Sequence, residues 1–193
     1  HQDITLYMLQ KQSNQLHIGM LLDGFYPSDI RVQKEAESLI TQYKVFILCC
    51  KKVGEKETEI INGVKVYRSI QYKNNAHRGI IDIRLAINFI HPYFKKELPI
   101  FIKENHINVL HVHDLPLAKT GYLAAKKFQL KTVLDLHENY AAALLTWFIW
   151  RKSWIIQLKN KLFFNYGRWM RYEANLIKKY DTIIAVVEEM KER

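Results

Sequence analysis

Two short polar corners, His113-Asp114 and His137-Glu138, carry the side chains in this sequence that are best suited to chemistry. An imidazole can hydrogen-bond a hydroxyl or a phosphate, and a carboxylate can orient a hydroxyl or accept its proton. We therefore predict that His113 and Asp114 are catalytic and that His137 and Glu138 bind substrate. The simpler alternative is that Asp114 only caps the following helix and His113 only packs. Asp135 is expected to be buried and structural.

Each corner follows a short run rich in Val, Leu and Ile, at residues 107–112 and 131–136, and residues 117–129 between them have helical periodicity. A strand, a crossover helix and a second strand of these lengths form a right-handed parallel unit, so both corners lie at the carboxyl edge of one sheet. Open α/β sheets bind ligands at that edge. The sequence thus predicts an α/β fold, a Rossmann-like parallel sheet with helices on both faces.

A third polar turn, residues 23–29, follows a predicted first strand over 18–22. Its Gly and Pro residues interrupt the strand pattern, and Asp29 is suited to cap a helix predicted over 30–43.

We predict that four residues of this region, Gly24, Tyr26, Asp29 and Arg31, bind substrate, because backbone amides at such a turn can approach a phosphate. The turn lacks the G-x-G-x-x-G pattern, however, and Arg31 has a simpler alternative as the partner of Glu35 one helical turn later.

The rest of the chain supplies further elements of the sheet. A second buried strand is expected over 44–50, and Asn62-Gly63 indicates a hairpin turn. The helical region 80–105 should be interrupted at Pro92 and at Pro99. Residues 141–179 are predicted to be mostly helical, 182–187 a last strand, and 188 the start of a helix. We expect one domain over 17–193, preceded by an uncertain N-terminal arm over 1–16.

His111 and His113 lie two apart on a predicted strand, so their side chains point the same way and could bind a metal ion. This spacing leaves a metal-dependent hydrolase as an alternative function. Further ligands would have to come from elsewhere in the chain, such as His137, and we predict no metal site.

The net charge of +10 and a pI near 9.5 indicate an anionic partner. A nucleic-acid-binding module is therefore an alternative, although basic and aromatic residues are not interleaved on a strand platform as in RNA-binding sheets. The N-terminus has no signal-peptide pattern, and no apolar run is long enough to span a bilayer. The adjacent Cys49 and Cys50 suit a reduced compartment.

An aromatic and basic segment follows the central unit. Trp147, Trp150 and Trp154 share one helical face, with Arg151 and Lys152 beside them. This combination is typical of the interface of an anionic membrane. The alternative is that these tryptophans are core residues or face another domain or subunit.

Three patterns, in this order, resemble the N-terminal half of a family 4 glycosyltransferase of the GT-B type. They are FYPSDIRVQKEAESL at 25–39, the corners HVHD at 111–114 and DLHE at 135–138, and Glu173 followed by YDTIIAV at 180–186. The resemblance covers about Leu16 to Arg193. It implies the acceptor-side domain of an enzyme that transfers a sugar from a nucleotide sugar, usually with retention, and that needs no metal or other cofactor.

The resemblance also implies partners: a nucleotide sugar, a glycan or lipid-linked acceptor, and a C-terminal donor domain that is absent from this sequence. We expect this chain alone to be inactive, because the positive groups that stabilise the leaving diphosphate belong to that second domain. The whole enzyme is expected to act in cell-surface polysaccharide or glycolipid synthesis. We expect it in the cytoplasm, peripheral on the inner face of the plasma membrane, with no nucleic-acid partner.

Overall fold

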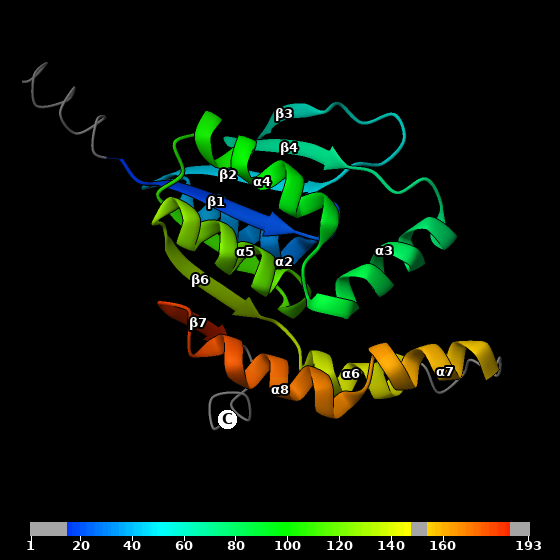
Figure 1. Ribbon diagram of the computed structural model, residues 1–193. Coiled ribbons are helices and arrows are strands. Elements are labelled where there is room, and N and C mark those ends of the chain that lie inside the picture. The colour runs from blue at the N-terminus through cyan, green and yellow to red at the C-terminus, as the bar shows by residue number, and fades with distance from the viewer. Residues whose placement is uncertain (1–14, 148–153, 186–193) are drawn as a thin grey trace, which may run out of the picture.

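The computed structural model describes residues 15–147 and 154–185, which form one twisted sheet of seven strands with helices packed against it (Figure 1). The strands are β1 (His17–Leu22), β2 (Lys44–Cys50), β3 (Thr58–Ile61), β4 (Val64–Ile70), β5 (Val109–His113), β6 (Lys131–Leu136) and β7 (Thr182–Ala185). Their order is β3-β4-β2-β1-β5-β6-β7, and only the β3–β4 pair is antiparallel. The predicted Rossmann-like parallel sheet is confirmed.

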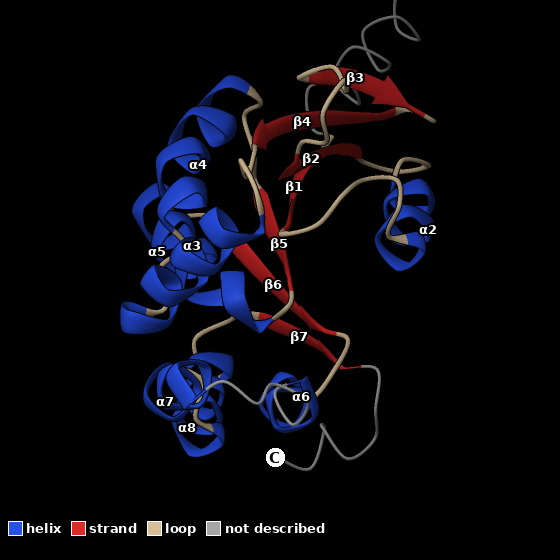
Figure 2. Ribbon diagram, turned by 90° about the vertical axis from the view of Figure 1, so that its right-hand side faces the viewer, coloured by secondary structure: helices blue, strands red, loops and turns tan. Residues whose placement is uncertain are grey.

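Helices cover both faces of this sheet, as predicted. Figure 2 shows α2 on one face and α4 and α5 on the other. The helices are α2 (Ile30–Leu39), α3 (Asn75–Asn88), α4 (Pro92–Glu104), α5 (Leu115–Phe128), α6 (Tyr140–Trp147), α7 (Trp154–Phe163) and α8 (Tyr166–Ile177). Two apolar cores result: a small one beneath α2 and a large one that includes residues of α4, α5 and α8.

The central strands are buried on both faces, as strands of a covered parallel sheet are. All residues of β2 after Lys44 are buried, and so is β5 after Val109. Helix α5 lies close to β5 at Gly121, where an added Cβ would lie 2.5 Å from Cγ2 of Val112. This close approach fixes the position of the corner that joins β5 to α5.

Most predicted boundaries hold to within a few residues. The Asn62-Gly63 hairpin is confirmed, and both residues have the positive φ of a type I′ turn (48° and 84°). Pro92 begins a new helix as expected. The interruption expected at Pro99 is wrong, because α4 continues through it. The helix predicted from 188 and residues 1–14 of the predicted arm lie outside the described residues.

Strands β1 and β5 are neighbours in the sheet, although α2, β2, β3, β4, α3 and α4 separate them in sequence. The strands that follow β1 in sequence, β2 to β4, lie on one side of the β1–β5 pair, and β6 and β7, which follow β5, lie on the other side. Such a reversal of strand order opens a crevice outside the carboxyl ends of the two central strands, where ligands of this class of fold bind. His113 and Asp114 lie at the end of β5, on this crevice.

Candidate functional site

The two predicted corners lie side by side on one rim of the sheet. Strands β5 and β6 pair in parallel with His113 opposite Asp135, and His137 follows the end of β6. Nδ1 of His113 is 3.4 Å from Nε2 of His137, and the two rings are parallel with centroids 5.7 Å apart. The adjacency predicted from the βαβ unit is therefore present, with both imidazoles at the carboxyl edge.

Asp135 connects the two histidines. Its Oδ2 lies 2.8 Å from Nε2 of His137 and 3.3 Å from Nδ1 of His113, and the residue is 1% exposed. Burial opposes ionisation of Asp135, but hydrogen bonds with His113 and His137 outweigh it and hold the pKa of this carboxyl below its usual range. The hydrogen bond to Asp135 raises the pKa of His137 against the effect of burial. Asp135 is thus buried, as expected, and holds the corners together.

Glu35, whose sequence position suggested only a pairing with Arg31, reaches this cluster from α2. Its carboxylate oxygens lie 3.5 Å from Nε2 of His111 and 4.0 Å from Nδ1 of His113. Burial raises the pKa of Glu35, and the neighbouring Asp135 carboxylate raises it further, whereas His113 lowers it. A glutamate one turn into an amphipathic helix gives no sequence signal for such a role.

His111 is buried behind the corners and stacks on His113, with ring centroids 4.5 Å apart. Burial, and then the neighbouring His113, lower the pKa of His111 to about 3. His111 is therefore neutral at physiological pH. It packs between Glu35 and Asp135 rather than facing solvent.

Asp114 has a backbone conformation that nearly all residues other than glycine avoid, with φ 67° and ψ 152°. It occupies the N-cap position of α5, yet its side chain makes no capping hydrogen bond among the described residues. The alternative that Asp114 serves only as a helix cap is therefore wrong. Burial raises the pKa of the Asp114 carboxyl, partly opposed by His137 and Arg31. A partly buried carboxyl on a strained backbone, with no capping role in the described part of the chain, is typical of a functional residue.

A cavity of about 730 Å³ opens beside these corners, a volume suited to a small-molecule ligand. Its lining comes from α3, α5, α6 and α7 and from the ends of β1, β5 and β6. The lining residues with polar or aromatic side chains are Asp23, Asn75, Arg78, Asp82, His113, Asp114, Glu138, Tyr140, Lys159 and Phe164. His113, Asp114 and Glu138 were predicted from sequence, whereas Asp23, Arg78 and Asp82 were not.

The acidic residues of the cavity differ in their surroundings. Burial, and then the charge of the nearby Asp23 carboxylate, raise the pKa of Asp82 to about 6, partly opposed by Arg78. Nη2 of Arg78 lies 3.8 Å from Oδ2 of Asp23. Burial, and then the charge of Asp114, raises the pKa of Glu138. The cavity therefore presents both hydrogen-bond donors and acceptors near neutral pH, which suits a ligand rich in hydroxyl groups.

The turn after β1 departs from its predicted role in one position. The prediction that Tyr26 binds substrate is wrong, because its side chain is 0% exposed and belongs to the core beneath α2. Gly24 is partly exposed, and its carbonyl accepts a hydrogen bond from the amide of Cys50. A substrate contact for Gly24 stays a prediction.

Asp29 caps α2 as predicted, accepting from the amides of Arg31 and Val32. It also forms two side-chain hydrogen bonds with Arg31, of 3.2 and 2.9 Å. The alternative pairing of Arg31 with Glu35 is therefore wrong. Arg31 lies near enough to Asp114 and Glu138 for their charges to raise its pKa. It faces the rim, where its substrate contact stays a prediction.

The predicted aromatic face is only partly described. Trp150, Arg151 and Lys152 lie outside the described residues, and Trp147 is the last residue of α6. Trp154 begins α7 and is 72% exposed, so the alternative that it is a core residue is wrong. Leu158 and Leu162 follow it on the same face of α7 and are 50% and 58% exposed.

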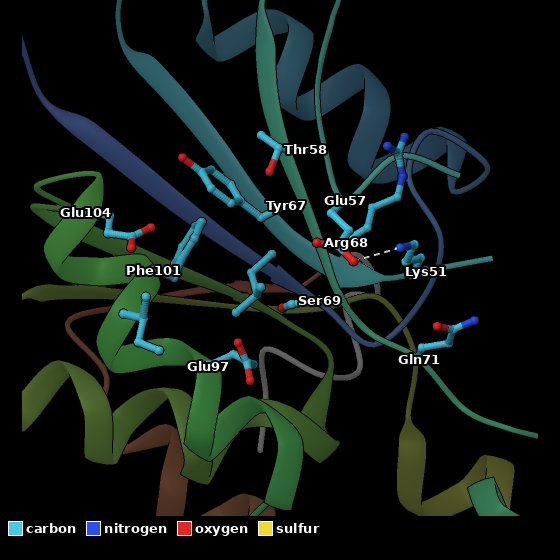
Figure 3. Close-up of a pocket in the computed structure, with 12 residues that line it drawn as sticks. Lys51, Glu57, Thr58, Tyr67, Arg68, Ser69, Gln71, Glu97, Phe101 and Glu104 are labelled. Atoms are coloured by element: carbon cyan, nitrogen blue, oxygen red, sulfur yellow. Dashed lines mark hydrogen bonds and ion pairs between the residues drawn. The ribbon is translucent and has the colours of Figure 1, made fainter. Parts of the chain in front are cut away.

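A second cavity, of about 390 Å³, lies away from the rim between β4 and α4 (Figure 3). Glu57, Glu97 and Glu104 line it, and Lys51 at its mouth pairs with Glu57 at 3.1 Å. None of the predicted site residues contributes to it. The rim cavity is therefore the better candidate for the functional site.

Residues 31–193 match the family model Glycosyltransferase Family 4. The chain belongs to this family. The resemblance inferred from the three sequence patterns is thus confirmed, and with it the assignment to the N-terminal domain of a GT-B enzyme. No match was found among curated proteins.

Two solved structures support the family's fold. Sucrose-phosphate synthase from Thermosynechococcus elongatus superposes with a TM-score of 0.64 over 92% of this chain and 44% of that chain, at 12% identity. A second structure of that enzyme gives a TM-score of 0.55 over 91% of this chain and 78% of that chain, also at 12% identity. The chain therefore spans less than half the length of the first of these structures, and it shares their fold.

Replacing Asp114 should separate backbone strain from function. We expect Asp114→Gly to be more stable than Asp114→Ala by about 1–3 kcal/mol, because only glycine adopts this φ and ψ without strain. Neither variant has a carboxylate, so the comparison isolates the backbone. Urea denaturation of both variants measures the difference, and equal midpoints would show that position 114 is unstrained.

The raised pKa of Asp82 predicts a pH-dependent stability. The folded state loses stability as pH rises through about 6, because Asp82 must then ionise in a partly buried site, whereas it ionises near 4 when unfolded. Asp82→Asn should therefore stabilise the chain at about pH 7.5 by an amount of order 1 kcal/mol, discounted for partial exposure, and less at about pH 5.

Urea midpoints at the two pH values test this expectation. Glu104→Gln, at an exposed carboxylate of α4, is the matched control and should behave alike at both values. A gain for Asp82→Asn that is equal at the two pH values would contradict the assigned cause.

Proposed function

We propose that this chain is the acceptor-binding half of a glycosyltransferase that transfers a sugar from a nucleotide sugar to a hydroxyl held in the rim cavity. The observation that carries the proposal is the cavity itself, which lies at the carboxyl ends of β1, β5 and β6 in a family 4 chain. Its lining combines Asp114 and Glu138 with Arg78 and Tyr140. Such mixed donors and acceptors suit the hydroxyl groups of a glycan.

In this proposal, Asp114 and Glu138 orient the acceptor hydroxyl, and one of the two carboxylates takes up the proton that it loses as the new glycosidic bond forms. A raised pKa makes each of them a stronger base than an ordinary carboxylate, which suits this role. His113 borders the same cavity beside them, but its side chain is 0% exposed, so in this proposal it supports the corner rather than contacting the acceptor. The positive charge of Arg31, which lies close to both carboxylates, would partly offset their negative charge where the acceptor binds.

The donor would be held by a second domain facing this rim. Negative charge grows on the leaving diphosphate during transfer, and preorganised positive groups must stabilise it. We propose that those groups belong to the second domain, that transfer proceeds with retention, and that the transfer step itself uses no metal or cofactor. The chain by itself would then bind acceptor without turnover.

We further propose that the acceptor is a glycolipid or a lipid-linked glycan in cell-surface polysaccharide synthesis, reached from the cytoplasmic face of the membrane. The exposed stripe Trp154, Leu158 and Leu162 on α7 supports this, because Lys159 of the same helix lines the rim cavity. Lys161 lies beside the stripe in sequence, and its charge would favour anionic lipids. No helix among the described residues has the length and apolar character needed to cross a membrane.

The transfer proposal predicts the effect of two substitutions in the full-length enzyme. Asp114→Asn and Glu138→Gln keep side-chain volume but remove the proton acceptors, and each should lower kcat/KM by about 100-fold or more. Product formation from nucleotide sugars and a glycolipid acceptor measures the effect. Glu104→Gln, remote from the rim, should keep wild-type activity, and full activity of both site variants would overturn the assignment.

The membrane proposal predicts that the chain sediments with anionic phospholipid vesicles and that binding weakens as salt increases. Replacing Trp154, Leu158 and Leu162 by serine should reduce the bound fraction at least tenfold. Leu123→Ser, at a 43% exposed leucine of α5, removes a comparable apolar side chain elsewhere and should have little effect. Unchanged vesicle binding by the triple variant would exclude α7 as the contact, and salt-sensitive binding to oligonucleotides instead would favour the nucleic-acid alternative.

A further inference from the structure

Four residues from three elements gather their metal-binding atoms at one point behind the rim. Glu35 comes from α2, His113 from the end of β5, Asp135 from β6, and His137 from the residue that follows β6. One ligand atom from each lies within 4.8 Å of each of the others. Two imidazoles and two carboxylates are therefore directed at one small volume.

The distances between these atoms are close to those of a tetrahedral metal site. Bonds of 2.0–2.2 Å place the ligand atoms of a tetrahedral zinc site roughly 3.3 Å apart. Nδ1 of His113 lies 3.3 Å from Oδ2 of Asp135 and 3.4 Å from Nε2 of His137. Oε2 of Glu35 is 4.0 Å from Nδ1 of His113, and the His137–Asp135 contact is 2.8 Å. These four distances lie within about 0.7 Å of the tetrahedral spacing, and every remaining pair of ligand atoms lies within 4.8 Å.

Hydrogen bonds alone leave this cluster incompletely satisfied. Oδ1 of Asp135, which could bind a cation, is buried without a hydrogen-bond partner among the described residues. Nε2 of His111 and Nε2 of His113 also lack one there, but these two atoms are not part of the ligand set. His111 and Asp135 are 3% and 1% exposed. The carboxylate of Glu35, which is partly exposed, also lies close to the buried carboxylate of Asp135, which is unfavourable unless a positive charge compensates them.

We propose that Glu35, His113, Asp135 and His137 bind one divalent transition-metal ion of the Zn²⁺ class. Imidazole nitrogen together with carboxylate oxygen favours Zn²⁺ over Mg²⁺ or Ca²⁺, which prefer oxygen ligands only. The ligand atoms are Nδ1 of His113, Nε2 of His137 and one oxygen from each carboxylate. Glu35 keeps a side-chain exposure of 24%, so the ion can enter from the α2 side.

The ion has a structural role in this proposal. It joins α2 to the ends of β5 and β6, and thereby fixes the residues immediately before Asp114 and Glu138. His111 is not a ligand but lies outside the four, 3.5 Å from Glu35 and 3.9 Å from Asp135. The site thus differs from the His111–His113 pair considered for a metal-dependent hydrolase, and the sugar-transfer step does not pass through it.

Zinc binding to the purified chain tests the proposal directly. After treatment with a chelator and dialysis, the protein is titrated with Zn²⁺ in competition with a chromophoric chelator, and with Co²⁺ while its visible absorption is recorded. We expect one equivalent of Zn²⁺, the absorption bands of four-coordinate Co²⁺, and a rise in Tm with Zn²⁺. None of these readouts depends on glycosyl transfer. Failure to bind Zn²⁺ would leave the proposed function unaffected, and lack of transferase activity would leave the metal proposal unaffected.

Two ligand variants and one control locate the site. His137→Ala and Glu35→Gln should each weaken Zn²⁺ binding at least tenfold, whereas His106→Asn, at an exposed histidine remote from the rim, should bind like wild type. Glu35→Gln decides the matter if His137→Ala does not fold, because Glu35 is only partly buried. Absence of saturable binding by wild type, or equal affinity of Glu35→Gln and His106→Asn, overturns the proposal.

Discussion

The candidate site depends on the buried carboxylate of Asp135, which stands opposite His113 in the β5–β6 pairing and holds His137 from the next corner. Because neighbouring parallel strands keep a fixed register, both imidazoles are held at one height on the rim. Their hydrogen bonds compensate the cost of burying Asp135 as an ion. A one-residue shift between β5 and β6 would turn Asp135 to the other face of the sheet and separate the two corners.

The rigid support of β5 and β6 explains how Asp114 can keep an unfavourable backbone conformation. Local strain persists only where the surrounding structure determines it. Here the amide of Asp114 donates to the carbonyl of Asp135, and α5 is packed against β5 at Gly121. The strand before Asp114 and the helix after it are both held in place, so the backbone of Asp114 takes the φ and ψ values that connect the two elements. The result is a carboxyl that borders the cavity instead of capping the helix.

The sequence was sufficient for the parts of the site that follow from local pattern. Strand periodicity places His113 and His137 at one edge, and the capping preference of Asp29 sets the start of α2. Contacts that depend on how helices approach the sheet were not predictable in this way. Glu35 looked like one more charged residue of an amphipathic helix, and Arg78 and Asp82 belong to α3, whose position over the rim follows from the long β2–β4 excursion. Tyr26 was misjudged because turn residues are usually exposed, whereas this one fills the core beneath α2.

The surroundings of the carboxyl groups at the rim lower the pKa of some and raise the pKa of others, and this difference indicates their roles. Asp135 is kept ionised by two imidazoles and is sealed from solvent, so it is suited to position its neighbours rather than to exchange protons with a ligand. Asp114, Glu138 and Asp82 all have raised pKa values and all line the cavity. When the surroundings of neighbouring titratable groups shift their pKa values in opposite directions, one group can position the site while another exchanges protons. Asp135 therefore positions the two corners, and Asp114 and Glu138 at those corners are the carboxyls suited to exchange protons with a ligand.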